Sequence, residues 1–452
     1  MLANAGIIHC ENRAGCGVLE FMDLKCKRIG LCLCLLLIVG NIQVFSGERD
    51  YRFDGKISRE VLENYLSRSI TMAELARSPG NLDDDLRMLR NIGAKLVGRS
   101  IFLWGGEERI NDPVFLAQGH NLAERIHRDD PDVVLQAAVF EIVTEDIGKV
   151  PIPDWVFHEF AQAPETRNFN YSKMLFPDNH LVDHWSGGAS VPDICQIETK
   201  MWFFFLAASY INAGFEAIHF GQLELVGRND PEYRNWADLL EHVRRYAAKR
   251  ARRHWVICDA HVPKGGPVLD GRLLLDFHAF PLRPKEVADS PQKAILAAGY
   301  LDAFYGRSHG GIAPSGWKCE HLPYLVEFDN FDGTDTPGQA SQAHGGSIFV
   351  WGYDEITWFA QQPESYRNEW LHYTWNWLKE HDRNGFLEMP GGRILTNGPA
   401  NPGEAGGKMV WYFANTKSPA CPQGFSQEDT IKAIWRADSG VAHTSPFTHA
   451  RP

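Results

Sequence analysis

Residues 217–225 read AIHFGQLEL, and this stretch decides the fold class that the sequence predicts. It begins as a short apolar run and ends at a carboxylate, Glu224. Amphipathic stretches typical of helices lie on both sides of it, at residues 191–213 and 233–250. A short buried strand between two helices is typical of a parallel α/β fold.

The same alternation recurs along the chain, and we predict from it an α/β fold of the (β/α)8 TIM barrel type. The eight predicted strands are residues 51–54, 94–104, 133–143, 217–225, 254–261, 272–280, 323–329 and 347–353. Further helices are predicted at residues 82–92, 113–128, 291–304 and 365–380. If residues 51–54 do not form a strand, residues 385–389 must close the barrel and every strand number falls by one.

Composition divides the chain into three parts. Residues 1–46 hold a basic stretch, an apolar run and small residues before a cleavage position, as in a secretory signal peptide with translation starting at Met22. A short buried helix or an uncleaved membrane anchor is the alternative for this segment. We expect residues 47–390 to form the barrel, with a long loop excursion after the third strand, and residues 391–452 to form a small C-terminal extension packed on it.

Composition also limits the partners that we expect. The net charge of −12 argues against nucleic acid, because polyanion binding draws on clustered Lys and Arg. The mature chain is expected to be secreted or periplasmic, with no stable membrane span, because its other apolar runs are too short. Motifs of serine hydrolases, NTPases and dinucleotide-binding proteins are missing from the sequence. Aromatic residues make up 12% of the chain, a surplus that fits either a large aromatic-rich core or a binding cleft.

Ionisable side chains end six of the predicted strands. In a parallel barrel the carboxyl ends of the strands meet at one mouth, so we expect these side chains to lie around one cleft. A carboxylate there has to be solvated or paired, since an unpaired buried charge is very costly. The strand-end residues are Glu141, Gln222 with Glu224, Asp259 with His261, Asp276 with His278, Glu327 with Asp329, and Asp354 with Glu355.

This arrangement resembles the retaining (β/α)8 glycoside hydrolases of clan A. The resemblance covers roughly residues 50–390 and depends on strand order and on two residues, Glu224 in HFGQLE and Glu327 in YLVEFD. It implies that Glu224 is the acid/base, that Glu327 is the nucleophile and that Trp351 forms an aromatic floor under the sugar. The clan usually has Asn directly before the acid/base, and this chain has Leu223 there.

The chemistry of glycosidic bond cleavage supports the same kind of site. One carboxyl group has to stay protonated for the leaving group and a second has to stay ionised, about 5 to 5.5 Å away in a retaining enzyme. Opposite strands of a barrel can meet that distance. Arg99 either holds Glu327 charged or pairs with Glu141, and the sequence leaves both open.

The remaining polar and aromatic residues of the predicted mouth are expected to bind the carbohydrate substrate, and we predict no metal and no cofactor. These residues are Arg99, Trp104, Glu141, Trp185, Gln222, Asp259, His261, Asp276, His278, Asp329, Trp351, Tyr353 and Asp354.

Two other functions stay open. Asp259, His261, Asp276 and His278 could bind a divalent metal for a metal-dependent hydrolase on the same barrel, although no His-x-His or His-Glu-x-x-His motif is present. The third hypothesis is a carbohydrate-binding barrel that retains a cleft but carries out no chemistry.

Overall fold

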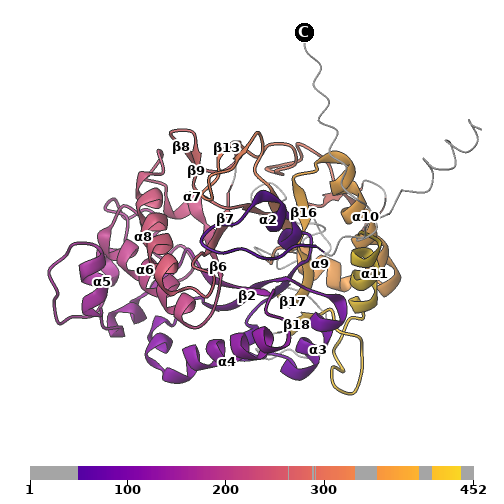
Figure 1. The fold of residues 1–452 in the computed structure, drawn as a ribbon, viewed down its shortest axis with the longest axis horizontal. Coiled ribbons are helices and arrows are strands. Elements are labelled where there is room, and N and C mark those ends of the chain that lie inside the picture. Colours follow the sequence, from indigo (N-terminus) through magenta and orange to yellow (C-terminus); the bar gives the residue numbers. More distant parts are fainter. Residues whose placement is uncertain are drawn as a thin grey trace, which may run out of the picture. The chain divides into compact units, whose positions relative to one another are not determined.

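The computed structural model describes residues 49–262, 264–287, 290, 292–330, 354–395 and 410–438. Their fold is mixed α/β and is built on one curled sheet of ten strands, with the longer helices around its outside (Figure 1). The strand order is β16-β15-β10-β7-β6-β3-β2-β1-β17-β18. Neighbours along it pair in parallel, except that β17 and β18 are antiparallel.

The strands of this sheet are short and buried. They are β1 (Ser69–Met72), β2 (Leu96–Leu103), β3 (Val134–Val139), β6 (Ala217–Gln222), β7 (Ile257–His261), β10 (His278–Pro281), β15 (Tyr324–Glu327), β16 (Gly385–Leu387), β17 (Met389–Leu395) and β18 (Val410–Phe413). Two-residue strands in the loops are β4 (Val143–Thr144), β5 (Ala189–Ser190), β8 (Val268–Leu269), β9 (Arg272–Leu273), β11 (Lys285–Glu286), β12 (Ala294–Ile295), β13 (Gly311–Ile312) and β14 (Lys318–Cys319).

Helices connect most of the parallel strands. They are α2 (Arg59–Leu66), α3 (Leu82–Ile92), α4 (Pro113–Asp129), α5 (Asp154–Glu159), α6 (Ile197–Asn212), α7 (Leu223–Val226), α8 (Arg234–Arg250), α9 (Glu355–Gln361), α10 (Glu364–His381) and α11 (Glu428–Asp438). Single 3-10 turns are η1 (Leu75–Arg77), η2 (Glu107–Asn111), η3 (Glu145–Lys149) and η4 (Tyr171–Lys173). Among the described residues, none of the helices has both the length and the apolar character needed to cross a bilayer.

Helix α3 has the bounds that the sequence predicts, and its two ends explain why. The Asn81 side chain accepts a hydrogen bond from the backbone N–H of Asp84, which is an N-cap, and Gly93 ends the helix with φ +79°. The periodicity between these signals places the apolar face on the sheet. The long excursion after the third predicted strand is present as well, between β3 and α6.

The predicted first strand at residues 51–54 is wrong. This segment is irregular, and Tyr51 packs edge-on against Tyr65 of α2 at 5.1 Å between ring centroids. The strand that pairs with β2 is instead β1, which the sequence analysis missed.

The predicted helix at residues 291–304 is also wrong. Backbone N–H groups there bond to side chains of α10, since the Tyr373 hydroxyl accepts from Leu296 at 2.9 Å. The predicted strand at 272–280 divides into β9 and β10, and residues 223–226 form α7 in place of a strand end. The predicted strand at 347–353 and the predicted signal segment lie outside the described residues.

Residues 385–395 form the strands β16 and β17, which lie at the two ends of the row of parallel strands. β16 pairs with β15, β17 pairs with β1, and only Glu388 separates β16 from β17 in the chain. The predicted boundary between residues 390 and 391 therefore falls inside β17. Beyond it, β18 extends the sheet and α11 packs beside α3, where Arg87 and Glu428 form two hydrogen bonds of 2.6 and 2.9 Å.

Glu388 is buried where β16 meets β17. Its side chain lies against Gly98 of β2, where a Cβ atom would collide with Glu388 Oε1. Burial raises the pKa of Glu388 to about 7, and the charge of Glu327 adds to this while Arg99 opposes it. Glu388 is therefore largely protonated in the folded chain below neutral pH.

We predict that the titration of Glu388 lowers the free energy of unfolding of the wild-type protein as the pH rises from about 4.5 to 7. In that range the folded chain keeps a proton that the unfolded chain releases, so deprotonation favours unfolding. The Glu388→Gln variant lacks this proton. Its free energy of unfolding relative to wild type should therefore rise by on the order of 3 kcal/mol between pH 4.5 and 7.5, measured by urea unfolding.

Glu428→Gln is the matched control for this prediction. Arg87 and Asn91 offset the burial of Glu428 and lower its pKa to about 2, so its contribution to stability is lost only below about pH 4.5. Parallel pH curves for wild type and Glu388→Gln would contradict the assignment of a buried proton to Glu388.

Candidate active site

A cavity of about 1250 Å³ lies at the carboxyl ends of the parallel strands. Its wall takes residues at or just after the ends of eight of them, so the predicted convergence of strand ends is present. These wall residues are Glu74, Trp104, Glu141, Gln222, His261, Pro281, Asp329 and Arg393. Further lining residues come from the loops, among them Trp185, Glu224, Tyr233, Lys264 and Arg283.

Glu327 is the centre of the polar network at the base of this cavity. Its Oε1 contacts the Arg99 guanidinium and lies 2.6 Å from His261 Nε2, while Arg393 Nη1 lies 3.4 Å from Oε2. Burial alone would raise the pKa of Glu327, but Arg99, Arg393 and His261 together hold it well below its usual range. Glu327 is therefore ionised at neutral pH, and Arg99 is its partner rather than that of Glu141.

Glu327 does not itself line the cavity. Glu327 is 2% exposed, and the side chains of Arg99, His261 and Arg393 lie between it and the open space of the cavity. Asp329, two residues later, does reach the wall, with Oδ1 3.6 Å from Arg393 Nη2.

Arg99 reaches Glu327 through an irregularity in β2. The pairing of β2 with β3 shifts register between Val97 and Ile101, and Arg99 has φ +53°, a left-handed conformation that a non-glycine residue rarely adopts. Such a bulge redirects a side chain from the position that a regular strand would give it.

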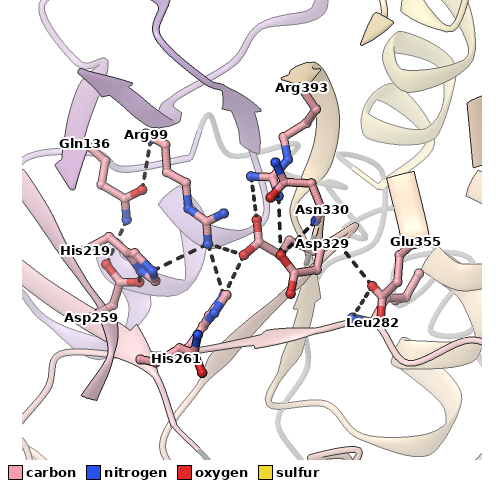
Figure 2. Close-up of polar contacts among 12 residues, drawn as sticks. Arg99, Gln136, His219, Asp259, His261, Leu282, Asp329, Asn330, Glu355 and Arg393 are labelled. Atoms are coloured by element: carbon pink, nitrogen blue, oxygen red, sulfur yellow. Dashed lines mark hydrogen bonds and ion pairs between the residues drawn. The ribbon is translucent and has the colours of Figure 1, made fainter. Parts of the chain in front are cut away.

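Below Arg99 lies a buried chain of three further side chains. Gln136 Nε2 donates to Asp259 Oδ1 at 2.7 Å, Asp259 Oδ2 lies 2.7 Å from His219 Nδ1, and His219 Nε2 lies 3.5 Å from Arg99 Nη2 (Figure 2). Burial raises the pKa of Asp259 well above its usual value and lowers that of His219 well below. Neither Gln136 nor His219 was among the predicted site residues, although a polar residue inside an apolar strand is a signal that it needs a partner.

Glu224 lies on the cavity wall in α7. Tyr233 donates its hydroxyl hydrogen to Glu224 Oε1 at 3.1 Å, and Lys264 Nζ lies 3.5 Å from Oε2. Its side chain is 27% exposed and therefore open to a ligand in the cavity. Glu141, also on the wall, accepts hydrogen bonds from the backbone and the side chain of Gln222 at 2.8 and 3.0 Å.

Aromatic side chains form one part of the wall. Trp104 is 45% exposed and makes edge-on contacts with Trp185 at 5.1 Å and with Phe140 at 5.4 Å between ring centroids. Trp185 comes from the excursion and is held by a 3.0 Å hydrogen bond from its Nε1 to the Glu141 carbonyl.

Four of the residues expected to bind substrate do not reach the cavity. Asp259 belongs to the chain below Arg99. Asp276 precedes β10, accepts from the backbone N–H of Cys258 at 2.9 Å and pairs with Arg244. His278 faces Ser308, and Asp354 is the N-cap of α9. Trp351 and Tyr353 lie outside the described residues.

The four residues of the metal hypothesis have separate partners. Asp259 bonds to Gln136 and His219, His261 to Glu327, Asp276 to Arg244, and His278 to Ser308. Within the described ranges, no group of three His, Cys, Asp or Glu side chains is arranged to hold a metal ion. The geometry therefore gives the metal hypothesis no ligand set.

Comparison with known proteins gives structural likenesses only. No family model and no curated protein matches the chain. The native debranching enzyme of Nostoc punctiforme is 11% identical, with a TM-score of 0.33, over 50% of this chain and 53% of that chain. A GH2 β-galacturonidase from Eisenbergiella tayi, bound to galacturonate, is 11% identical, with a TM-score of 0.38, over 82% and 50%.

The isomalto-dextranase of Arthrobacter globiformis T6, complexed with panose, is 8% identical, with a TM-score of 0.33, over 61% of this chain and 51% of that chain. The chain thus spans about half the length of each of these solved structures.

Proposed function

We propose that this chain is a glycoside hydrolase in which Glu327 is the ionised carboxylate and Glu224 is the acid/base. One observation carries the proposal. A carboxylate held charged by two arginines lies at the base of a cavity whose wall presents a second, accessible carboxyl group. A pair of carboxyl groups in different environments is what glycosidic bond cleavage requires.

The proposal includes a closed (β/α)8 barrel. Its support is that β16 pairs with β15 and β17 pairs with β1, with one residue between β16 and β17, so that residues 385–395 serve as one eighth strand. Counted from β1, β6 is then the fourth strand and β15 the seventh. Glu224 and Glu327 keep the places that the resemblance to clan A requires.

In the proposed mechanism, Glu224 donates its proton to the glycosidic oxygen while a Glu327 oxygen attacks the anomeric carbon. Water then cleaves the glycosyl–Glu327 ester, with Glu224 accepting the proton from that water. The side chains of His261 and Arg393 lie between Glu327 and the cavity, so the sugar has to displace at least one of them before Glu327 can attack. Trp104 and Trp185 offer apolar faces for neighbouring sugar units.

A second function is favoured by the enclosure of Glu327. Its charge is already balanced by two arginines, His261 Nε2 lies within hydrogen-bond distance, and little of the carboxylate is exposed. A carbohydrate-binding protein without chemistry would need no more than the cavity and its aromatic wall. It would bind glycans in a saturable way and release no product.

Export remains part of the proposal, supported by the sequence pattern of residues 1–46 alone. N-terminal sequencing of the protein recovered outside the cell should give a residue close to Gly47. Retention of Met22 in that protein would contradict cleavage.

We predict that Glu224→Gln and Glu327→Gln lose activity in different ways. Without its acid, Glu224→Gln should lose about 10³-fold in kcat on unactivated glycosides and much less on 2,4-dinitrophenyl glycosides, whose leaving group needs no proton. Glu327→Gln should lose activity on both. Rates on a panel of synthetic glycosides check this, with circular dichroism to confirm folding.

Glu232→Gln is the control for both variants, since Glu232 is exposed and pairs only with Arg234 among the described residues. Hydrolysis at near-normal rates by both Glu224→Gln and Glu327→Gln would contradict the assignment of Glu224 as acid/base and Glu327 as nucleophile. Saturable binding with no product from wild type on any glycoside would favour the binding protein instead.

We predict that Trp104→Ala weakens glycan binding about tenfold, because the exposed ring loses its contact with the sugar, worth about 1.4 kcal/mol. The measurement is calorimetric titration in the Glu224→Gln background. Trp155→Ala is the matched control, since Trp155 is 39% exposed but lies on α5 and stacks on Tyr246. Equal losses in the two variants would place the sugar elsewhere.

A further inference from the structure

The backbone of Arg99 needs to be held in place. A residue other than glycine rarely adopts a left-handed conformation and keeps it only where its surroundings fix it. Two hydrogen bonds do this at Arg99. Its N–H donates to Gln136 Oε1 at 3.1 Å, and its carbonyl accepts from the N–H of Glu74 at 3.1 Å.

The first of these bonds also fixes the amide of Gln136. Because Oε1 accepts from Arg99, the NH2 group points the other way, toward Asp259 Oδ1. Asp259 thus accepts on Oδ1 and presents Oδ2 to His219 Nδ1. All of these side chains are buried, so each unmatched donor or acceptor would carry a penalty.

The hydrogens of Arg99 Nη2 can be placed by the same reasoning. His261 Nε2 lies between Glu327 Oε1 and Arg99 Nη2, and because a carboxylate only accepts, the hydrogen on this nitrogen points to Glu327. One Nη2 hydrogen goes to Glu327, and the other faces His219 Nε2. His219 then has to offer a lone pair at Nε2 and carry its hydrogen on Nδ1, which donates to Asp259. This arrangement of hydrogen bonds therefore requires Asp259 to be ionised in spite of its burial, which raises its pKa, with the nearby Arg99 charge opposing that rise.

We propose that Gln136, Asp259 and His219 are positioning residues that close a ring on Arg99, fixing both its backbone and its guanidinium so that it faces Glu327. None of the three lines the cavity, so they act through Arg99 and do not touch the substrate. The role of Asp259 is therefore positioning and not substrate binding. The ring of hydrogen bonds does not depend on the proposed function, whereas its effect on catalysis rests on that function.

Asp259→Asn tests this with almost no change of shape. The amide introduced by this substitution can still accept from Gln136 with its oxygen, but its NH2 group then faces His219 Nδ1. That nitrogen must become an acceptor, and the His219 hydrogen must move to Nε2, where it points at the Arg99 guanidinium. The variant therefore reverses the tautomer and replaces an attraction at Arg99 by a repulsion.

The readout is the ¹⁵N spectrum of histidine-labelled protein, with His219 assigned by its loss in His219→Gln. We expect the Nδ1–H tautomer in wild type and the Nε2–H tautomer in Asp259→Asn. On a glycoside that wild type hydrolyses, kcat should fall about 10- to 100-fold with little change in KM. The wild-type spectrum alone tests the ring if the variant does not fold.

Asp85→Asn is the matched control. Asp85 is also buried and also accepts from an amide, Asn415 Nδ2 at 3.1 Å, but it belongs to α3. This variant should leave both the His219 tautomer and kcat unchanged. An Nε2–H tautomer in wild type, or the same tautomer in wild type and Asp259→Asn, overturns the proposal. A tautomer switch in a protein that hydrolyses no glycoside supports the ring and contradicts the proposed hydrolase.

Discussion

The contact between Arg99 and Glu327 is the interaction on which the rest of the site depends. A carboxylate with 2% exposure cannot stay charged without nearby cations and hydrogen-bond donors, and here three strands bring them: Arg99 from β2, His261 from β7 and Arg393 from β17. A buried ion pair adds little net stability, because desolvation offsets the attraction, whereas removing one partner is costly. The fold therefore tolerates this buried cluster of charges only when all of its members are present.

This requirement explains two irregular features of the sheet. Arg99 lies at a bulge in β2 and adopts a left-handed backbone, which a regular strand would not need. Arg393 lies on β17, which begins after the break at Glu388. Burial and the neighbouring Glu327 charge favour the protonated form of Glu388, so only one of these two neighbouring carboxyl groups is charged below neutral pH.

The sequence predicts those parts of the fold whose signals are local. Asn81 and Gly93 mark the ends of α3, and the strand-end residues Glu141, His261 and Asp329 do meet around one cavity. β1 was missed because four residues are too few to show a period. The helix expected at 291–304 fails because tyrosines of α10 take its backbone N–H groups, a tertiary contact that no local pattern reveals.

The site was predicted less completely than the fold for a related reason. Strand position places Glu327 near the mouth, but which side chains cover it depends on β17, which was expected to lie partly outside the barrel. The role of Gln136 and His219 depends on their hydrogen bonds to Asp259 and Arg99, which lie on strands distant in sequence.

The central claim is that Glu327 is a charged carboxylate at the base of the cavity. ¹³C NMR of protein labelled at the glutamate carboxyl carbons, with the signal assigned by its loss in Glu327→Gln, measures this charge without any substrate. The Glu327 signal should keep the shift of an ionised carboxylate from pH 8 down to pH 4, below which most glutamates are protonated. A Glu327 signal that titrates at pH 4.5 or above would contradict the claim.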